Sequence, residues 1–210
     1  MNVQGLLSLL CCSLLAGACA LPSAMAEPPF VGAGILPYCF DQDRVFVLLG
    51  FDHHKGAWTD FGGGGEKVTS LEDGQRRWET RVQTAMREAI EESRGILGRQ
   101  QIKAAVDPGR FFDHPTLDYR IFTANIGCIP AANFRQVPVP VGERWDHWRE
   151  KSDFYWIDLA LLKDQVATAK DRQSALLTQA PGGVRPLFSL LYDSLSQQFS
   201  RGEDGRLFSK

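Results

Sequence analysis

Cysteine is scarce in this chain of 210 residues, and no excess of one charge is present. Of the five cysteines, only Cys39 and Cys128 lie beyond an apolar N-terminal leader. Two isolated cysteines in apolar, strand-like contexts are too few for a metal site or a disulfide framework, so we expect ordinary buried thiols. The formal net charge is −2, which offers no broad attraction to nucleic acid or anionic lipid. A long nucleic acid is therefore not an expected partner.

Charged residues are missing from positions 1–26. The apolar run from Leu6 to Ala20 is shorter than the ~20 residues that span a bilayer, and the small residues around Met25 match a signal-peptidase cleavage pattern. The pattern predicts a signal peptide over 1–26 and a secreted or periplasmic protein without a transmembrane anchor. The alternative is a true start at Met25, which would give a cytoplasmic protein.

The remaining chain has the composition of one globular domain, with 44% hydrophobic and 23% charged residues. We expect this domain over 27–200 and a flexible tail over 201–210. Runs rich in β-branched and aromatic residues, separated by polar turns, predict a hairpin and four further strands. The predicted strands are 30–40 and 44–51 in the hairpin, then 58–61, 111–112, 119–126 and 154–159. We expect a loop over 130–140 and an amphipathic helix over 185–199.

Carboxylates are concentrated between residues 79 and 92, where the spacing predicts a helix that continues to about residue 94. At 3.6 residues per turn, an apolar stripe lies on one face, while Glu88, Glu91 and Glu92 converge on another. Like charges at this spacing cost a bare helix about 0.2 to 0.5 kcal/mol per pair. A cation is therefore expected among them, and two Mg²⁺ ions would serve.

The order of these residues resembles the second half of the Nudix box: Glu79, seven other residues, then Arg87-Glu88-Ala89-Ile90-Glu91-Glu92. The run from Trp58 to Glu66, with four consecutive glycines, is similar to the strand and turn that lead into that box. Two departures occur. Thirteen residues separate Gly65 from Glu79 where the pattern has five, and Arg94 stands where it has a glycine, with Gly95 one place later. A helix one residue longer would account for the second departure.

The resemblance implies an α/β fold, a Nudix-type α/β/α sandwich with a mixed β-sheet. It also implies a metal-dependent hydrolase that cleaves a diphosphate linkage in a nucleoside diphosphate joined to another moiety, by attack of water on phosphorus. Mg²⁺ is the implied cofactor, with Mn²⁺ as a substitute, because both take hard oxygen ligands. The expected partner is a small nucleotide or a nucleotide-sugar-like diphosphate. The oligomeric state is left open, with a homodimer among the options.

Four metal ligands follow from the resemblance: Glu88, Glu91, Glu92 and a backbone carbonyl group of the glycine-rich turn, from Gly65 or Gly64. It also pairs Arg87 with Glu79, because a guanidinium can hold a carboxylate and orient the neighbouring glutamates.

The general base is left open by the sequence. Glu88 is the candidate within the motif, while Glu150 and Glu143 precede the last predicted strand and could supply a carboxylate from a loop. A catalytically silent module of the same fold, which binds a nucleotide or a protein partner, is the alternative function.

Overall fold

The computed structural model describes residues 30–69, 74–139, 142, 146–171 and 173–209. The predicted signal peptide and the candidate base Glu143 lie outside the described residues. Within these ranges, the helices are all too short or too polar to cross a bilayer.

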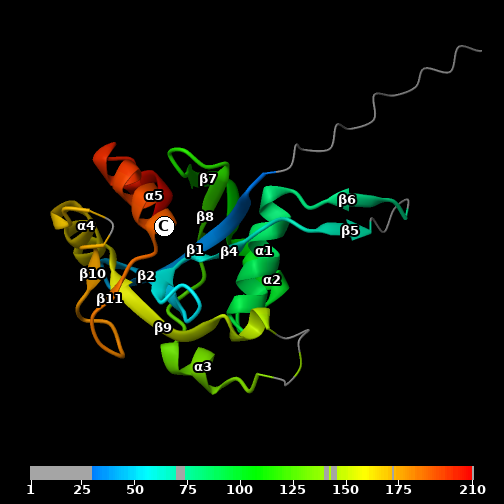
Figure 1. Cartoon of the computed structure of the whole chain (residues 1–210), viewed down its shortest axis with the longest axis horizontal. Coiled ribbons are helices and arrows are strands. Elements are labelled where there is room, and N and C mark those ends of the chain that lie inside the picture. The colour runs from blue at the N-terminus through cyan, green and yellow to red at the C-terminus, as the bar shows by residue number, and fades with distance from the viewer. Residues whose placement is uncertain (1–29, 70–73, 140–141, 143–145, 172, 210) are drawn as a thin grey trace, which may run out of the picture.

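A seven-stranded mixed sheet forms the centre of the molecule (Figure 1). Its strands are β1 (Gly32–Asp41), β2 (Arg44–Asp52), β3 (Ala57–Thr59), β4 (Phe61–Gly63), β7 (Val106–Asp113), β8 (Tyr119–Asn125) and β9 (Lys151–Asp158). The strand order is β3-β2-β1-β8-β7, with β4 paired to β1 and β9 paired to β2. β1 and β8 run parallel, and the other pairs are antiparallel. The predicted hairpin and the predicted strands are confirmed, although the strand expected over 58–61 is divided between β3 and β4.

Two short ribbons lie outside this sheet. One consists of β5 (Lys67–Thr69) and β6 (Arg76–Trp78), and the other of β10 (Leu176–Leu177) and β11 (Arg185–Pro186). The β5–β6 ribbon contains the residues that lengthen the segment between Gly65 and Glu79, and it projects from the body of the molecule (Figure 1).

Helices cover both faces of the sheet, as the predicted α/β/α sandwich requires. One face carries α1 (Arg81–Glu92), α2 (Arg99–Ala105) and α3 (Ala131–Gln136), together with a 3-10 turn, η2 (His147–Arg149). The other carries α4 (Leu159–Thr168), α5 (Ser189–Ser200) and α6 (Asp204–Leu207). Because side chains alternate along a strand, β1 sends Ala33 and Ile35 into the first apolar core and Leu36 and Tyr38 into the second.

Three expectations about the second half of the chain are wrong. The segment 130–140 contains α3, which is held by the buried side chain of Phe134. The last long helix begins at Ser189, because Arg185 pairs with β10 instead. The tail beyond residue 200 is packed rather than loose, since Leu207 and Phe208 are buried in the core.

Cys39 and Cys128 form a disulfide bond, so the expectation of two separate buried thiols is also wrong. They are 89 residues apart in the sequence. The parallel register of Tyr38 with Asn125 brings the end of β1 beside the segment that follows β8. Cys128 is exposed and lies beyond β8, not within a strand. A pattern of neighbouring residues cannot show this pairing, because it depends on which two strands are adjacent.

Candidate functional site

α1 is defined by local signals at both ends. Thr80 is its N-cap: the Thr80 side chain accepts a hydrogen bond from Gln83 N, and the Gln83 side chain accepts one from Thr80 N. This reciprocal capping box fixes where the helix begins. The buried residues of the helix include Ala85 and Ala89, which pack on the sheet and direct the neighbouring glutamates along its surface.

The helix ends at Glu92, so the expected extension by one residue is not found. Arg94 instead adopts a left-handed conformation with φ 57°, followed by Gly95 with φ 74°. That conformation is unfavourable for a residue with a Cβ atom. The Arg94 guanidinium is held by two carbonyl groups, with Nη2 donating to Lys151 O at 2.7 Å and Nη1 to Phe134 O at 3.3 Å. These bonds join the end of α1 to the start of β9.

Arg87 is the centre of a group of carboxylates that we call the Arg87 cluster, formed by Glu79, Arg87, Glu88 and Glu91. Arg87 Nε donates to Glu79 Oε1 at 3.0 Å, and Nη1 donates to Glu88 Oε1 at 2.9 Å and to Glu91 Oε2 at 3.0 Å. Arg87 Nη2 donates to the carbonyl oxygen of Gly64 at 2.8 Å. The predicted pairing of Arg87 with Glu79 is confirmed. The carbonyl group found beside the cluster is that of Gly64, one of the two glycines proposed from the sequence.

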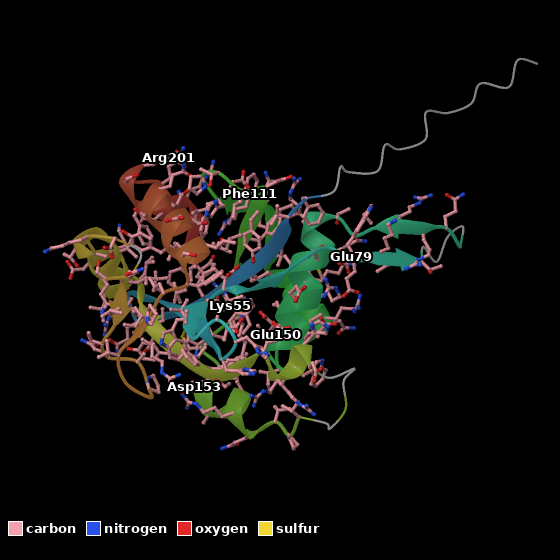
Figure 2. All side chains as sticks on the ribbon, in the orientation of Figure 1. Lys55, Glu79, Phe111, Glu150, Asp153 and Arg201 are labelled. Carbon is pink, nitrogen blue, oxygen red and sulfur yellow. A yellow bond between two sulfur atoms is a disulfide. The ribbon has the colours of Figure 1, made fainter. Side chains whose placement is uncertain are left out.

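Glu79 is buried at the base of the β5–β6 ribbon, where Figure 2 labels it. Its Oε2 accepts hydrogen bonds from Glu66 N and from Thr84 Oγ1, each at 3.1 Å. With Arg87 as well, these bonds satisfy both carboxylate oxygens within the protein. Glu79 therefore anchors Arg87 and is not itself a free ligand.

Glu88 approaches the glycine-rich strand β4 closely. A Cβ atom at Gly63 would lie 2.4 Å from Glu88 Oε1, so only glycine allows this approach. Burial raises the pKa of Glu88 to about 7, although Arg87 acts in the opposite direction. Glu88 thus exchanges its proton near neutral pH.

The other face of β4 also meets a polar group. A Cβ atom at Gly62 would lie 2.2 Å from the hydroxyl oxygen of Tyr119. That hydroxyl donates a hydrogen bond of 2.9 Å to Asp60 Oδ2, and both residues are buried. Burial raises the pKa of Asp60, while Lys151 and the bond from Tyr119 lower it.

A second group, the Lys151 cluster, lies at the C-terminal end of α1 and consists of Asp52, Thr59, Glu92 and Lys151. Lys151 Nζ lies 2.6 Å from Thr59 Oγ1, 2.9 Å from Glu92 Oε1 and 3.6 Å from Asp52 Oδ2. The side chains of Lys151 and Glu92 are both 0% exposed. Glu92 Oε2 accepts a hydrogen bond from Gly62 N at 2.9 Å. Burial raises the pKa of Glu92, whereas the ammonium group of Lys151 acts to lower it.

Glu150 joins the site at the same end of α1. The carboxylates of Asp52, Glu92 and Glu150 can each offer an oxygen atom within 4.8 Å of the others. Glu150 is partly exposed, and its Oε1 lies 3.1 Å from His147 Nδ1. Figure 2 shows Glu150 and Lys55 near the middle of the molecule, with Glu79 toward the ribbon. The structure therefore brings Glu150 beside Glu92 of α1, as is required of a general base that is supplied by a loop.

Sequence reasoning missed four buried polar residues around these clusters, Asp52, Asp60, Tyr119 and Lys151, and the exposed Lys55 beside them. Lys55 Nζ pairs with Asp52 Oδ2 at 2.6 Å. A single signal was available, namely that Asp52 and Lys151 are charged residues at the ends of apolar strand-like runs. Their pairing follows from the β2–β9 register, in which Asp52 is opposite Lys151.

A cavity of about 660 Å³ lies between the β5–β6 ribbon and α1. Its lining includes Trp78, Gln83, Met86 and Ile90. At 100° per residue, positions 83, 86 and 90 lie on the side of α1 opposite to positions 88 and 92. Glu79 and Arg87 also line the cavity, so it adjoins the Arg87 cluster, whereas Glu88 and Glu92 face away from it.

The ligand atoms of the Arg87 cluster fit a hard divalent cation. They are carboxylate oxygens with a backbone carbonyl group nearby, the donor types that Mg²⁺ and Mn²⁺ take in proteins. Three carboxylates share one guanidinium there, so negative charge is left in excess. A bound cation would offset that excess.

Comparison with protein-family models gives no match, and comparison with curated proteins gives none either. Several solved structures are similar. A C. elegans Ap4A hydrolase in a binary complex has 16% identity and a TM-score of 0.40, over 84% of this chain and 98% of that one. A Francisella tularensis bifunctional NMN adenylyltransferase/ADP-ribose pyrophosphatase, complexed with AMP and a manganese ion, has 17% identity and a TM-score of 0.45, over 85% and 43%. A MutT/Nudix family protein from Enterococcus faecalis has 19% identity and a TM-score of 0.31, over 63% and 45%.

Nudix proteins are thus among the structures that this chain resembles, as the motif predicts. The identities are below 20% and the TM-scores below 0.5. The residues of the site itself, rather than these similarities, therefore carry the functional proposal.

Proposed function

We propose that this protein is a metal-dependent hydrolase that cleaves a diphosphate linkage in a nucleoside diphosphate joined to another moiety. The observation that carries the proposal is the Arg87 cluster, in which one guanidinium holds three carboxylates beside the carbonyl group of Gly64. Glu88 and Glu91 are the proposed metal ligands, with Gly64 or Gly65 supplying a carbonyl oxygen. Glu92 is not among these ligands, because Gly62 N donates a hydrogen bond to its Oε2 and Lys151 Nζ forms an ion pair with its Oε1.

The residues of the cluster have distinct roles in this proposal. A bound Mg²⁺ would neutralise phosphoryl oxygens and lower the pKa of a water molecule. Arg87 fixes the positions of Glu88 and Glu91, and Glu79 fixes Arg87 in turn. Arg87 and Glu79 therefore act through the ligands and need not touch the substrate.

Two residues can take a proton from the attacking water. Glu88 has a pKa raised to about 7, which suits a base at neutral pH. Glu150 has a side chain that is 28% exposed, and it lies beside Asp52 and Glu92 at the C-terminal end of α1. Glu143 stays a prediction, because it lies outside the described residues.

The test is turnover by the purified protein of a panel of nucleoside diphosphate-linked compounds, with Mg²⁺, with Mn²⁺ and with EDTA. Glu91→Gln should lower the metal-dependent rate by at least about 100-fold, because it removes a ligand. Glu203→Gln is the matched control: Glu203 is a glutamate beyond α5, and its substitution should leave the rate unchanged. Wild-type turnover by Glu91→Gln would contradict the metal assignment. A folded, metal-binding protein without turnover would favour the catalytically silent module.

We also propose that the protein is exported. The Cys39–Cys128 bond supports this location, because disulfides persist mainly in oxidising compartments. Mass spectrometry of the native protein should find an N-terminus at Glu27. A cytosolic chain that still carries residues 1–24 would contradict it.

A further inference from the structure

Lys151 places an ammonium group inside the acidic site rather than at its edge. Its side chain is 0% exposed, and it lies across β2 at Gly50. A Cβ atom at Gly50 would lie 2.8 Å from Lys151 Cδ, so the glycine leaves room for the lysine. The backbone is fixed as well, because Lys151 O accepts the bond from Arg94. The fold therefore fixes both the backbone of Lys151 and the path of its side chain, and with them the position of Nζ.

The surroundings of this ammonium resemble those of a bound cation. Three oxygens lie around Nζ, from Thr59, Glu92 and Asp52, at 2.6, 2.9 and 3.6 Å. The contact with Thr59 is a hydrogen bond, and those with Glu92 and Asp52 are ion pairs. A buried ammonium needs such partners, because it has given up its hydration.

The same carboxylates form the compact group of Asp52, Glu92 and Glu150. Lys151 Nζ already contacts two of the three. A divalent cation in that group would lie within a few ångströms of the ammonium, and the two positive charges would repel each other strongly in a site without water. The lysine and a metal ion therefore exclude each other there.

We propose that Lys151 is a positioning residue that acts as a built-in counter-ion. It fixes Glu92 and keeps divalent metal out of the Asp52–Glu92–Glu150 group, so that metal binds only on the side of Glu88 and Glu91. This inference rests on the proposed metal site. It also departs from the expectation that Glu92 is a ligand.

The test counts bound Mn²⁺ per chain by electron paramagnetic resonance of the free ion, at about pH 7.5, for the wild type and for Lys151→Met. Methionine fills much of the same volume without the charge. Lys163→Met is the matched control, because Lys163 Nζ also lies 2.9 Å from a carboxylate oxygen, that of Asp204, away from the site. Lys151→Met should bind about one more Mn²⁺ per chain than the wild type, because Glu92 loses its internal cation and Asp52 keeps only its ion pair with Lys55. Lys163→Met should bind the wild-type number.

Equal Mn²⁺ counts for the wild type and Lys151→Met would overturn the inference. That result is distinguishable from failure of the proposed function, which would show as a wild-type protein that binds no Mn²⁺ and has no metal-dependent turnover. If the wild type binds no Mn²⁺ but Lys151→Met binds one ion per chain, the inference is still supported.

Glu92→Gln keeps the test decisive if Lys151→Met does not fold. Glutamine can still accept a hydrogen bond from Lys151, and the ammonium remains in place. The wild-type number of Mn²⁺ ions in Glu92→Gln, with a dissociation constant changed by less than about 3-fold, would support the inference. Loss of one Mn²⁺ ion would overturn it, because Glu92 would then be a ligand.

Discussion

The two clusters beside α1, the Arg87 cluster and the Lys151 cluster, hold the same kinds of groups in different surroundings. The Arg87 cluster is open to water, since the side chains of Arg87 and Glu91 are 17% and 27% exposed. The Lys151 cluster is dry, with Lys151 and Glu92 at 0%. Charges that water can reach are able to exchange partners at low cost, whereas a buried pair depends on each member for the compensation of the other. The Arg87 cluster, which is the open one, is therefore suited to ligand exchange. The Lys151 cluster, which is the dry one, is suited to holding a fixed arrangement.

The largest effect should come from removing the cation of the Lys151 cluster. Without metal, Lys151→Met should lower the free energy of unfolding by about 3 to 5 kcal/mol, because it leaves the buried Glu92 without its ion-pair partner. Lys163→Met, whose ion pair is partly exposed, should cost less than about 1 kcal/mol. Urea unfolding in EDTA measures both. Equal losses would remove the distinction between a dry and an open cluster.

The next effect concerns Glu88, which belongs to the open cluster although it is itself buried. Its pKa is about 7 in the folded protein and near 4.5 when unfolded. The folded state therefore retains a proton that the unfolded state has lost. The stability that the raised pKa of Glu88 contributes is fully present below pH 4.5. It is lost as the pH rises toward 7, by about 3 kcal/mol in total.

Urea unfolding of the metal-free protein between pH 4.5 and 8 measures this loss. Glu88→Gln removes the titrating group and should flatten the profile over the same range. An unchanged slope in Glu88→Gln would assign the pH dependence to other groups, of which Glu92 is the first candidate.

A smaller effect should follow from Arg87→Lys. Lysine keeps the charge but loses the planar fork that reaches Glu79, Glu88 and Glu91 together. The metal-dependent rate should fall by about 10- to 100-fold, with little change in the free energy of unfolding. Rate assays and urea unfolding of the same variant test this. A loss of stability as large as that of Lys151→Met would show that the two clusters do not differ as described.

The smallest effect compares two residues at position 94. Both Arg94→Gly and Arg94→Ala lose the bonds to Lys151 O and Phe134 O. The left-handed conformation is also unfavourable for alanine, so the Arg94→Ala variant should be less stable than Arg94→Gly by about 1 kcal/mol. Thermal unfolding of the two variants side by side measures the difference. Equal stability would show that the backbone relaxes at this position.

The open cluster could be predicted because its parts are close in the sequence. The contact of Arg87 with Glu91 follows from their spacing of four residues in one helix, and the contact of Arg87 with Glu79 is implied by the resemblance to the Nudix box. The order of the strands and helices could be predicted from β-rich runs and turn residues, whereas the layered α/β/α fold follows from the resemblance to the Nudix box.

The dry cluster could not be predicted, because its members come from β2, β3, α1 and β9. Lys151 meets Asp52 only through the β2–β9 register, and it meets Glu92 only because α1 packs on that face. The Cys39–Cys128 bond depends in the same way on the parallel pairing of β1 and β8. Local patterns specify elements, whereas these contacts depend on which elements become neighbours.

The two glycines of β4 allow charged and polar groups on opposite faces of the sheet to lie close enough to influence each other's pKa. With no side chain at Gly62 or Gly63, Glu88 on one face and the Tyr119 hydroxyl on the other are separated by little more than a strand of backbone. The pKa of Tyr119 is raised well above its usual value by burial, then by Asp60, and then by Glu92 and Glu88 across the sheet. Neutralising those glutamates should therefore change the ring signals of Tyr119, which makes this tyrosine an intrinsic spectroscopic probe of occupancy on the opposite side.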